Sequence, residues 1–164
     1  MELVEIKIKR FKEPVTGILL GNGTQWSLVK RNVVDYVLDG FQFTNKRYVA
    51  SNCPIKEDTL QYRILAIKNS SKDISSKIDL NILEEDKLLY SFLKNSNILV
   101  AICLHREDVL YVGKIKGVNT KSFILESYDT ELRESGIMNI EFDKVRYIQM
   151  HTDYLDSLSL IIDK

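Results

Sequence analysis

The sequence is poor in the residue types that most often mark chemistry, because its 164 residues include only two cysteines and two histidines. Cys53 and Cys103 lie far apart, and neither has a cysteine or histidine neighbour at metal-ligand spacing. This favours two small thiols over a disulfide or a metal site. His105 and His151 fall in expected turns, where a solvated histidine is commoner than a catalytic base. No catalytic residue, metal ligand or cofactor-binding residue is therefore predicted.

The sequence also lacks an excess of charge of one sign and a long hydrophobic run. Lys and Arg number 23, as do Asp and Glu, whereas nucleic-acid-binding domains commonly carry a marked basic excess. Only residues 1–52 lean that way, with eight basic against five acidic side chains, while 98–164 hold eight against eleven. No apolar run approaches the ~18 residues of a membrane-spanning helix, and the first residues have no apolar signal core. We therefore expect a cytoplasmic, non-membrane protein.

What the sequence does contain is a repeated pattern of strand-like segments. Residues 15–21 align with 111–117 at an offset of 96, and residues 41–49 align with 140–148 at an offset of 99. A three-residue insertion between the two blocks would account for the change of offset. The polar stretch 129–136 has the composition of a loop that could hold it. The repeat therefore predicts two small units of the same architecture.

Each unit is expected to contain five short antiparallel strands. Apolar and polar residues alternate at Val4, Ile6 and Ile8, which is the period of a strand with one buried face. Gly17 and Gly113 stand inside the second strand of each copy, where the absence of a side chain suits a strongly curved strand. Short, curved antiparallel strands in this number are typical of a small barrel of the SH3-like or Sm-like kind.

The stretch between the two units has a different pattern. Residues 84–94 form the clearest helix, with acidic residues in the first turn and an apolar stripe. After the second unit, residues 160–162 are apolar enough to dock as a last strand. We predict a mainly β protein with a minor helical part: a first barrel at 1–52, a helical linker at 53–97, and a second barrel with a C-terminal extension at 98–164.

Two polar stretches are candidates for partner binding. The string 35–40 reads either as a bend in which Tyr36 packs sideways or as a recognition loop, since tyrosine combines apolar area with a polar tip. The stretch 129–134 reads either as a solvated acidic loop or as an anionic surface that docks on a basic partner. The candidate partner-binding residues are Trp26, Asp35, Tyr36, Asp39, Asp129, Glu131 and Glu134.

The glycines that bound residues 17–21 and 113–117, together with a later Val-Arg pair, resemble the outline of Sm-like RNA-binding barrels. The family's first motif carries an Asp and an Asn after that glycine, where this sequence has Gly23 and Ser27. The glycine that follows the motif's arginine is replaced by tyrosine, as at Tyr48. The resemblance therefore implies the shape of the barrel without the residues that read RNA.

A second resemblance covers most of the chain. Trp26-x-Leu28-Val29, the string 35–40 and the closing stretch 154–158 look like an uncharacterised group of small bacterial proteins. That group has no established activity, so this likeness implies no function.

These observations favour a non-enzymatic bacterial protein-binding module, such as an immunity protein or a defence-system component. The alternative is an RNA- or DNA-binding Sm-like protein that uses the weakly basic first barrel, with Trp26 and Tyr36 as stacking platforms. Homo-oligomerisation through the barrel edges is a further expectation, because an unpaired edge strand can accept a neighbour.

Overall fold

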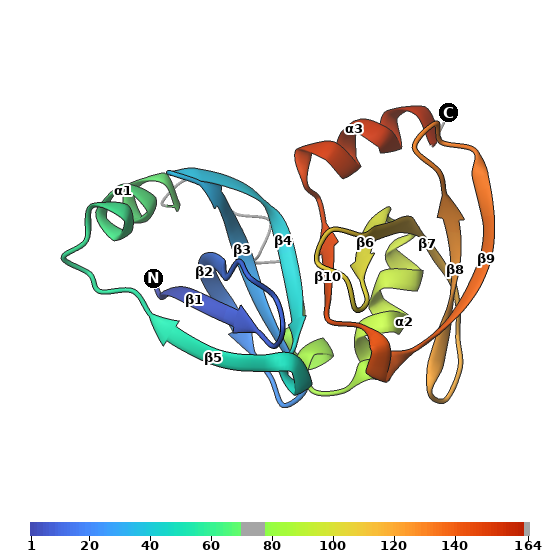
Figure 1. The fold of residues 1–164 in the computed structure, drawn as a ribbon, viewed down its shortest axis with the longest axis horizontal. Helices are drawn as coiled ribbons and strands as arrows, with labels where there is room; N and C mark the ends of the chain where they lie inside the picture. The colour runs from blue at the N-terminus through green and yellow to red at the C-terminus, as the bar shows by residue number, and fades with distance from the viewer. Residues whose placement is uncertain (70–77, 163–164) are drawn as a thin grey trace.

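The computed structural model describes residues 1–69 and 78–162 (Figure 1). The chain is mainly β with a minor helical part, as the sequence predicts. Its strands form one open antiparallel sheet in the order β5-β1-β2-β3-β4-β10-β6-β7-β8-β9. The strands are β1 (Leu3–Ile8), β2 (Val15–Asn22), β3 (Trp26–Val34), β4 (Val37–Asn45), β5 (Val49–Pro54), β6 (Val100–Cys103), β7 (Leu110–Val118), β8 (Ser122–Tyr128), β9 (Glu134–Glu141) and β10 (Tyr147–Met150).

The helices confirm one sequence prediction and correct another. The helix predicted at 84–94 is α2, displaced by two residues at each end. The strand predicted at 160–162 is wrong, because these residues form the last turn of α3. The helices are α1 (Leu60–Asn69), α2 (Asp86–Ser96) and α3 (Asp153–Ile162), with 3₁₀ helices η1 (Lys46–Tyr48), η3 (Leu80–Leu83) and η4 (Phe142–Lys144).

The two halves of the sheet meet where β4 pairs with β10. Phe43 lies opposite Ile148, and Gln42 lies opposite Gln149. This pairing makes the sheet continuous, with β5 and β9 as its outer strands on opposite sides of the molecule (Figure 1). The description of the halves as two barrels joined by a linker stays a prediction.

Strand order and register are the same in both halves. The first half runs β5-β1-β2-β3-β4 and the second β10-β6-β7-β8-β9. Leu19 pairs with Val29, and the residues 96 positions later, Ile115 and Leu125, also pair. A bulge follows directly after each of these pairs. We call residues 96 positions apart equivalent.

The offset of 96 also holds between the β3–β4 and β8–β9 hairpins, where the sequence alignment predicts an offset of 99. Trp26 pairs with Asn45, and their equivalents Ser122 and Glu141 pair as well. The predicted three-residue insertion at 129–136 is therefore wrong, since both hairpins have the same number of residues between these partners. The alignment at 99 followed similar side chains rather than backbone position.

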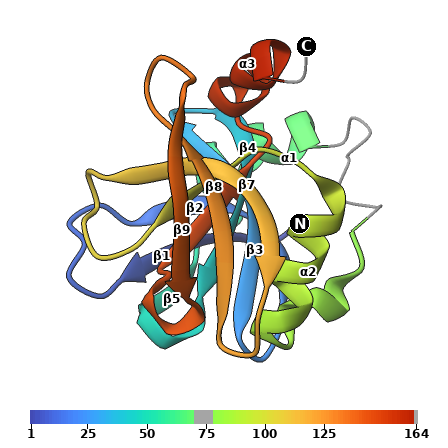
Figure 2. The ribbon, with the colours of Figure 1, turned by 90° about the vertical axis from the view of Figure 1, so that its right-hand side faces the viewer.

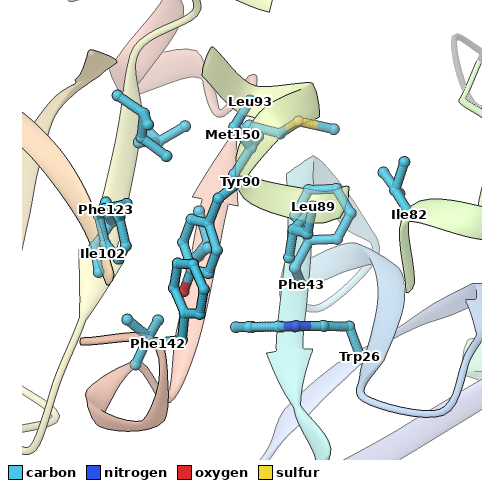
Figure 3. Packing of buried hydrophobic residues seen from close by; sticks show 14 of the residues in the cluster. Trp26, Phe43, Ile82, Leu89, Tyr90, Leu93, Ile102, Phe123, Phe142 and Met150 are labelled. Carbon is cyan, nitrogen blue, oxygen red and sulfur yellow. The ribbon is translucent and has the colours of Figure 1, made fainter. Parts of the chain in front are cut away.

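A shared hydrophobic core crosses the junction. Trp26 and Phe43 from the first half pack with Phe123 and Phe142 from the second around Tyr90 of α2 (Figure 3). The Tyr90 ring stacks on Phe123 and Phe142, with centroid distances of 4.3 and 4.7 Å, and meets Trp26 edge to face at 6.1 Å. Helix α2 therefore connects the two halves through packing.

Candidate partner-binding face

The hairpin between β3 and β4 carries three exposed apolar side chains around its turn. Asp35 adopts a left-handed backbone conformation with φ of 45° and, with Tyr36, makes the turn between the paired residues Val34 and Val37. Val34 is 59% exposed and Val37 47% exposed, and Val33 is exposed beside them. Valine is β-branched and therefore suits a strand, but these three valines are exposed and so do not contribute to the hydrophobic core.

Tyr36 holds this hairpin in place by packing sideways. Its half-buried ring joins the cluster around Leu65 of α1, and its carbonyl oxygen accepts a hydrogen bond from Lys68 Nζ at 2.6 Å. The sideways packing considered for Tyr36 is thus the arrangement found. The contact leaves Asp35 and the valines as the accessible part of the tip.

The first residues of β4 also anchor α3. Asp39 Oδ1 accepts a hydrogen bond from the backbone N–H of Asp153 at 2.7 Å, at the first turn of α3. The Thr152 hydroxyl caps the same turn by accepting from the backbone N–H of Leu155 at 3.2 Å, as N-cap threonines do. Gly40 has φ of 66°, and a Cβ there would lie 2.7 Å from the Thr152 backbone nitrogen. The hairpin and α3 are therefore held in close contact.

Helix α3 continues from this contact across the second half. Leu155, Leu158 and Ile162 face the sheet and pack in a cluster that includes Tyr128 at the end of β8. Outside this contact, α3 leaves Tyr154 56% exposed, and Leu160 and Ile161 are exposed at its far end. An amphipathic helix normally presents polar residues there, so this exposed apolar surface is unusual.

The hairpin between β8 and β9 follows directly after Tyr128. Asp129 Oδ1 accepts hydrogen bonds from the backbone N–H groups of Glu131 and Arg133 at 2.8 and 3.0 Å. The Arg133 guanidinium pairs with the Glu131 carboxylate. Asp129 therefore shapes the loop, while Glu131 and Glu134 are exposed to solvent.

These three segments lie at one end of the molecule (Figures 1 and 2). We call the surface formed by residues 33–39, 129–134 and 153–161 the end face. Its acidic side chains outnumber the basic ones, since Arg133 is the sole Lys or Arg in these segments. His151 lies beside the end face with its Nδ1 3.1 Å from Asp156 Oδ1. The acidic side chains are Asp35, Asp39, Asp129, Glu131, Glu134, Asp153 and Asp156.

Six of the seven sequence-predicted site residues belong to the end face, and Trp26 does not. Trp26 is fully buried in the core (Figure 3), and its Nε1 donates a hydrogen bond to Asp86 Oδ1 at 3.0 Å. Its assignment as a partner contact or a stacking platform is therefore wrong. A large apolar side chain at the start of a strand serves the core here, because α2 covers it.

The sequence analysis missed the apolar part of the end face. The three valines next to Asp35 break the alternation of a strand, which could have marked them as exposed. Tyr154 and Ile161 are seven residues apart and so share a face of α3, but the sequence predicts a strand at 160–162. Contact between the hairpins and α3 depends on the fold and has no signal in the sequence.

Elsewhere the described part of the chain holds no group of three or more His, Cys, Asp or Glu placed to bind a metal ion. Within residues 1–69 and 78–162 no helix is long and apolar enough to cross a membrane. Comparisons with protein-family models, with curated proteins and with solved structures give no match to this chain.

Proposed function

We propose that this chain is a protein-binding module whose end face docks on a basic protein. The observation that carries the proposal is the juxtaposition of exposed Val34, Val37 and Tyr154 with a surplus of carboxylates on one surface. Apolar side chains supply the area that a protein interface buries, and the carboxylates attract and orient a partner of opposite charge. An immunity protein that neutralises a basic toxin, or a component of a defence system, would use such a face.

The nucleic-acid alternative uses the weakly basic residues 1–52, and the mainly acidic end face is not suited to bind phosphate beside them. Phosphate backbones are bound by clusters of Lys and Arg, whereas Arg133 on this face is already paired with Glu131. The two proposed stacking platforms are also occupied, because Trp26 is in the core and Tyr36 packs beside α1.

A duplicated architecture supports the same proposal. The constant offset of 96 in strand pairing is what two copies of an SH3-like or Sm-like five-stranded unit would produce. In that description, the β3–β4 hairpin and the β8–β9 hairpin of the end face are equivalent elements. The exposed residues of the first are mainly apolar, and those of the second are mainly acidic. Residues 1–52 and 98–164 would be the two barrels, with 53–97 between them.

Co-purification from the native cell tests the proposal. We expect the tagged chain to retain a basic protein at a fixed stoichiometry, to keep it after nuclease treatment, and to lose it as ionic strength rises, because salt screens exposed charges. Recovery of nucleic acid with no stoichiometric protein would contradict the proposal.

A further inference from the structure

A groove on the opposite side of the sheet from the main core contains an arginine, Arg31, whose side chain forms no hydrogen bond or ion pair within the described residues. Arg31 of β3, Gln42 of β4 and Gln149 of β10 line it. Gln42 and Gln149 face away from the main core because they alternate with core residues along their strands. The loop before β2 and the turn that precedes β7 form its other side, and the cavity has a volume of about 170 Å³.

Arg31 is half-buried in this groove. Burial lowers the pKa of its guanidinium, which the charge of Asp39 partly offsets. Within the described residues, the Arg31 side chain makes no hydrogen bond or ion pair, and the Asp39 carboxylate accepts a hydrogen bond from the α3 backbone. A partly desolvated guanidinium offers up to five donors in a planar fork that matches a carboxylate.

Further hydrogen-bond donors line the groove with Arg31. Gln149 Nε2 donates to Gln42 Oε1 at 3.1 Å, and Gln42 Nε2 donates to Thr44 Oγ1 at 3.1 Å. Each amide nitrogen carries two hydrogens, so each retains one beyond these bonds. The positive charge of Arg31 therefore gives this side of the groove its preference for a negatively charged group.

The lining also includes two carboxylates, which disfavour a ligand that is only anionic. Glu107 accepts hydrogen bonds from the backbone N–H groups of Lys12 and Glu13 at 3.0 Å each, and these bonds lower the pKa of its carboxyl group. Glu13 contributes a second, exposed carboxylate. Phe11, Val15 and other apolar side chains line the remaining wall.

We propose that this groove binds a small zwitterion of the α-amino acid type with an apolar side chain. The ligand's carboxylate binds Arg31, its ammonium group meets Glu13 and Glu107, and its side chain contacts Phe11 and Val15. This assignment does not depend on the protein partner proposed above, since Arg31, Glu13, Glu107, Phe11 and Val15 lie outside the end face and only Val33 of the lining belongs to both surfaces.

Calorimetric titration of the full chain with leucine tests the assignment. We expect saturable binding of leucine. Leucinamide and 4-methylpentanoate each lack one of the two charged groups, so each should bind more weakly than leucine by roughly tenfold or more. Inorganic phosphate should not compete, because its charge is repelled by the two glutamates. Absence of saturable leucine binding, or equal binding of all four probes, would overturn the assignment.

Two variants separate binding from folding. Arg31→Gln should abolish leucine binding and leave the thermal unfolding temperature close to that of the wild type, since within the described residues the Arg31 side chain has no hydrogen bond or ion pair to lose. Arg63→Gln, which removes an exposed arginine of α1, is the matched control and should bind leucine normally. Should Arg31→Gln unfold, Glu13→Gln at an exposed position supplies the test, with an expected loss of affinity of roughly tenfold. Unchanged leucine affinity in the folded Arg31→Gln or in Glu13→Gln would contradict the site.

Discussion

Trp26 and Tyr90 of the buried aromatic cluster differ in whether their polar atoms have hydrogen-bond partners. Trp26 Nε1 has the Asp86 carboxylate as its acceptor. The Tyr90 hydroxyl is buried and has no hydrogen-bond partner among the described residues, and Figure 3 shows it beside Phe142. Burial raises the pKa of Tyr90 well above its usual range, so the hydroxyl stays neutral. A neutral buried hydroxyl without an acceptor costs stability.

Replacement of Tyr90 by Phe should therefore stabilise the fold. The ring keeps its stacking on Phe123 and Phe142, and the unsatisfied hydroxyl is removed, for an expected gain of about 1 kcal/mol in the free energy of unfolding. Trp26→Phe is the contrasting variant, because it leaves Asp86 Oδ1 without its donor and removes buried apolar area, and it should destabilise by about 2–4 kcal/mol. Urea denaturation measures both. A marked loss of stability in Tyr90→Phe would show that the hydroxyl has an acceptor.

The buried thiol of Cys103 makes the stability depend on pH in the alkaline range. Burial raises its pKa from 9.0 to about 11. Because the folded state holds the proton more tightly than the unfolded state, this contribution is complete below pH 9.0 and is lost as the pH rises towards about 11. We expect unfolding midpoints to fall over this range, and to fall less steeply in Cys103→Ala. Equal slopes for the two proteins would contradict this account.

At the scale of secondary-structure elements, close contact between neighbouring strands depends on two glycines. A Cβ at Gly17 would lie 2.4 Å from the carbonyl oxygen of Lys30, and one at the equivalent Gly113 would lie 2.3 Å from that of Glu126. Both contacts are with backbone atoms, which cannot move without disturbing the strand pairing. Gly117 is less restricted, because a Cβ there would first meet the Ile124 Cδ1 atom at 3.2 Å.

Gly113→Ala should therefore destabilise the protein by about 1–3 kcal/mol through overpacking. Gly117→Ala, on the same strand, is the matched control, and we expect a change within about 0.5 kcal/mol. Thermal unfolding of the two variants measures the difference. Equal stability of the two variants would mean that the strands are not in contact at Gly113.

Much of the secondary structure could be predicted from local pattern, and the errors have identifiable causes. The strands followed from alternation and turn residues, and α2 from its apolar stripe. The end of α3 was misread because Leu160, Ile161 and Ile162 form a short apolar run, which does not distinguish a strand from a helix. The acidic residues of the end face could be predicted as exposed, but their place on one surface with Val34 and Tyr154 could not, because it depends on α3 contacting both β4 and β8.

At the scale of the whole molecule, the outer strands β5 and β9 carry different side chains from β10 and β4, which pair at the junction of the two halves. Ile148 and Met150 of β10 are buried against β4, whereas their equivalents on the outer strand β5 are Asn52 and Pro54. Phe43 of β4 has Asn139 as its equivalent on β9. A proline on an edge strand and polar side chains in place of apolar ones discourage pairing with another chain. The expected homo-oligomerisation through the edges is therefore disfavoured.

The wild-type protein should be a monomer in solution. The triple variant Asn52→Ile, Pro54→Met, Asn139→Phe restores the side chains of the inner junction at both outer edges. The outer edges at β5 and β9 are different surfaces, so β5 of one molecule would pair with β9 of the next in a head-to-tail arrangement. We therefore expect the variant to form assemblies whose size grows with protein concentration. Size-exclusion chromatography with light scattering measures the molar mass of both proteins and so distinguishes a monomer from larger assemblies. A wild-type oligomer that Asn139→Lys dissociates would contradict the proposed role of the edges.

The role of the end face is tested most directly by comparing capture of the native partner by three immobilised proteins. The wild type and Ile137→Lys, which places a charge at an exposed apolar residue outside the end face, should retain the same basic protein in equal amounts. Val34→Lys with Val37→Lys should lose it almost completely, because two ammonium groups would replace apolar area and repel a basic surface. Equal capture by all three proteins would contradict the end face as the binding surface.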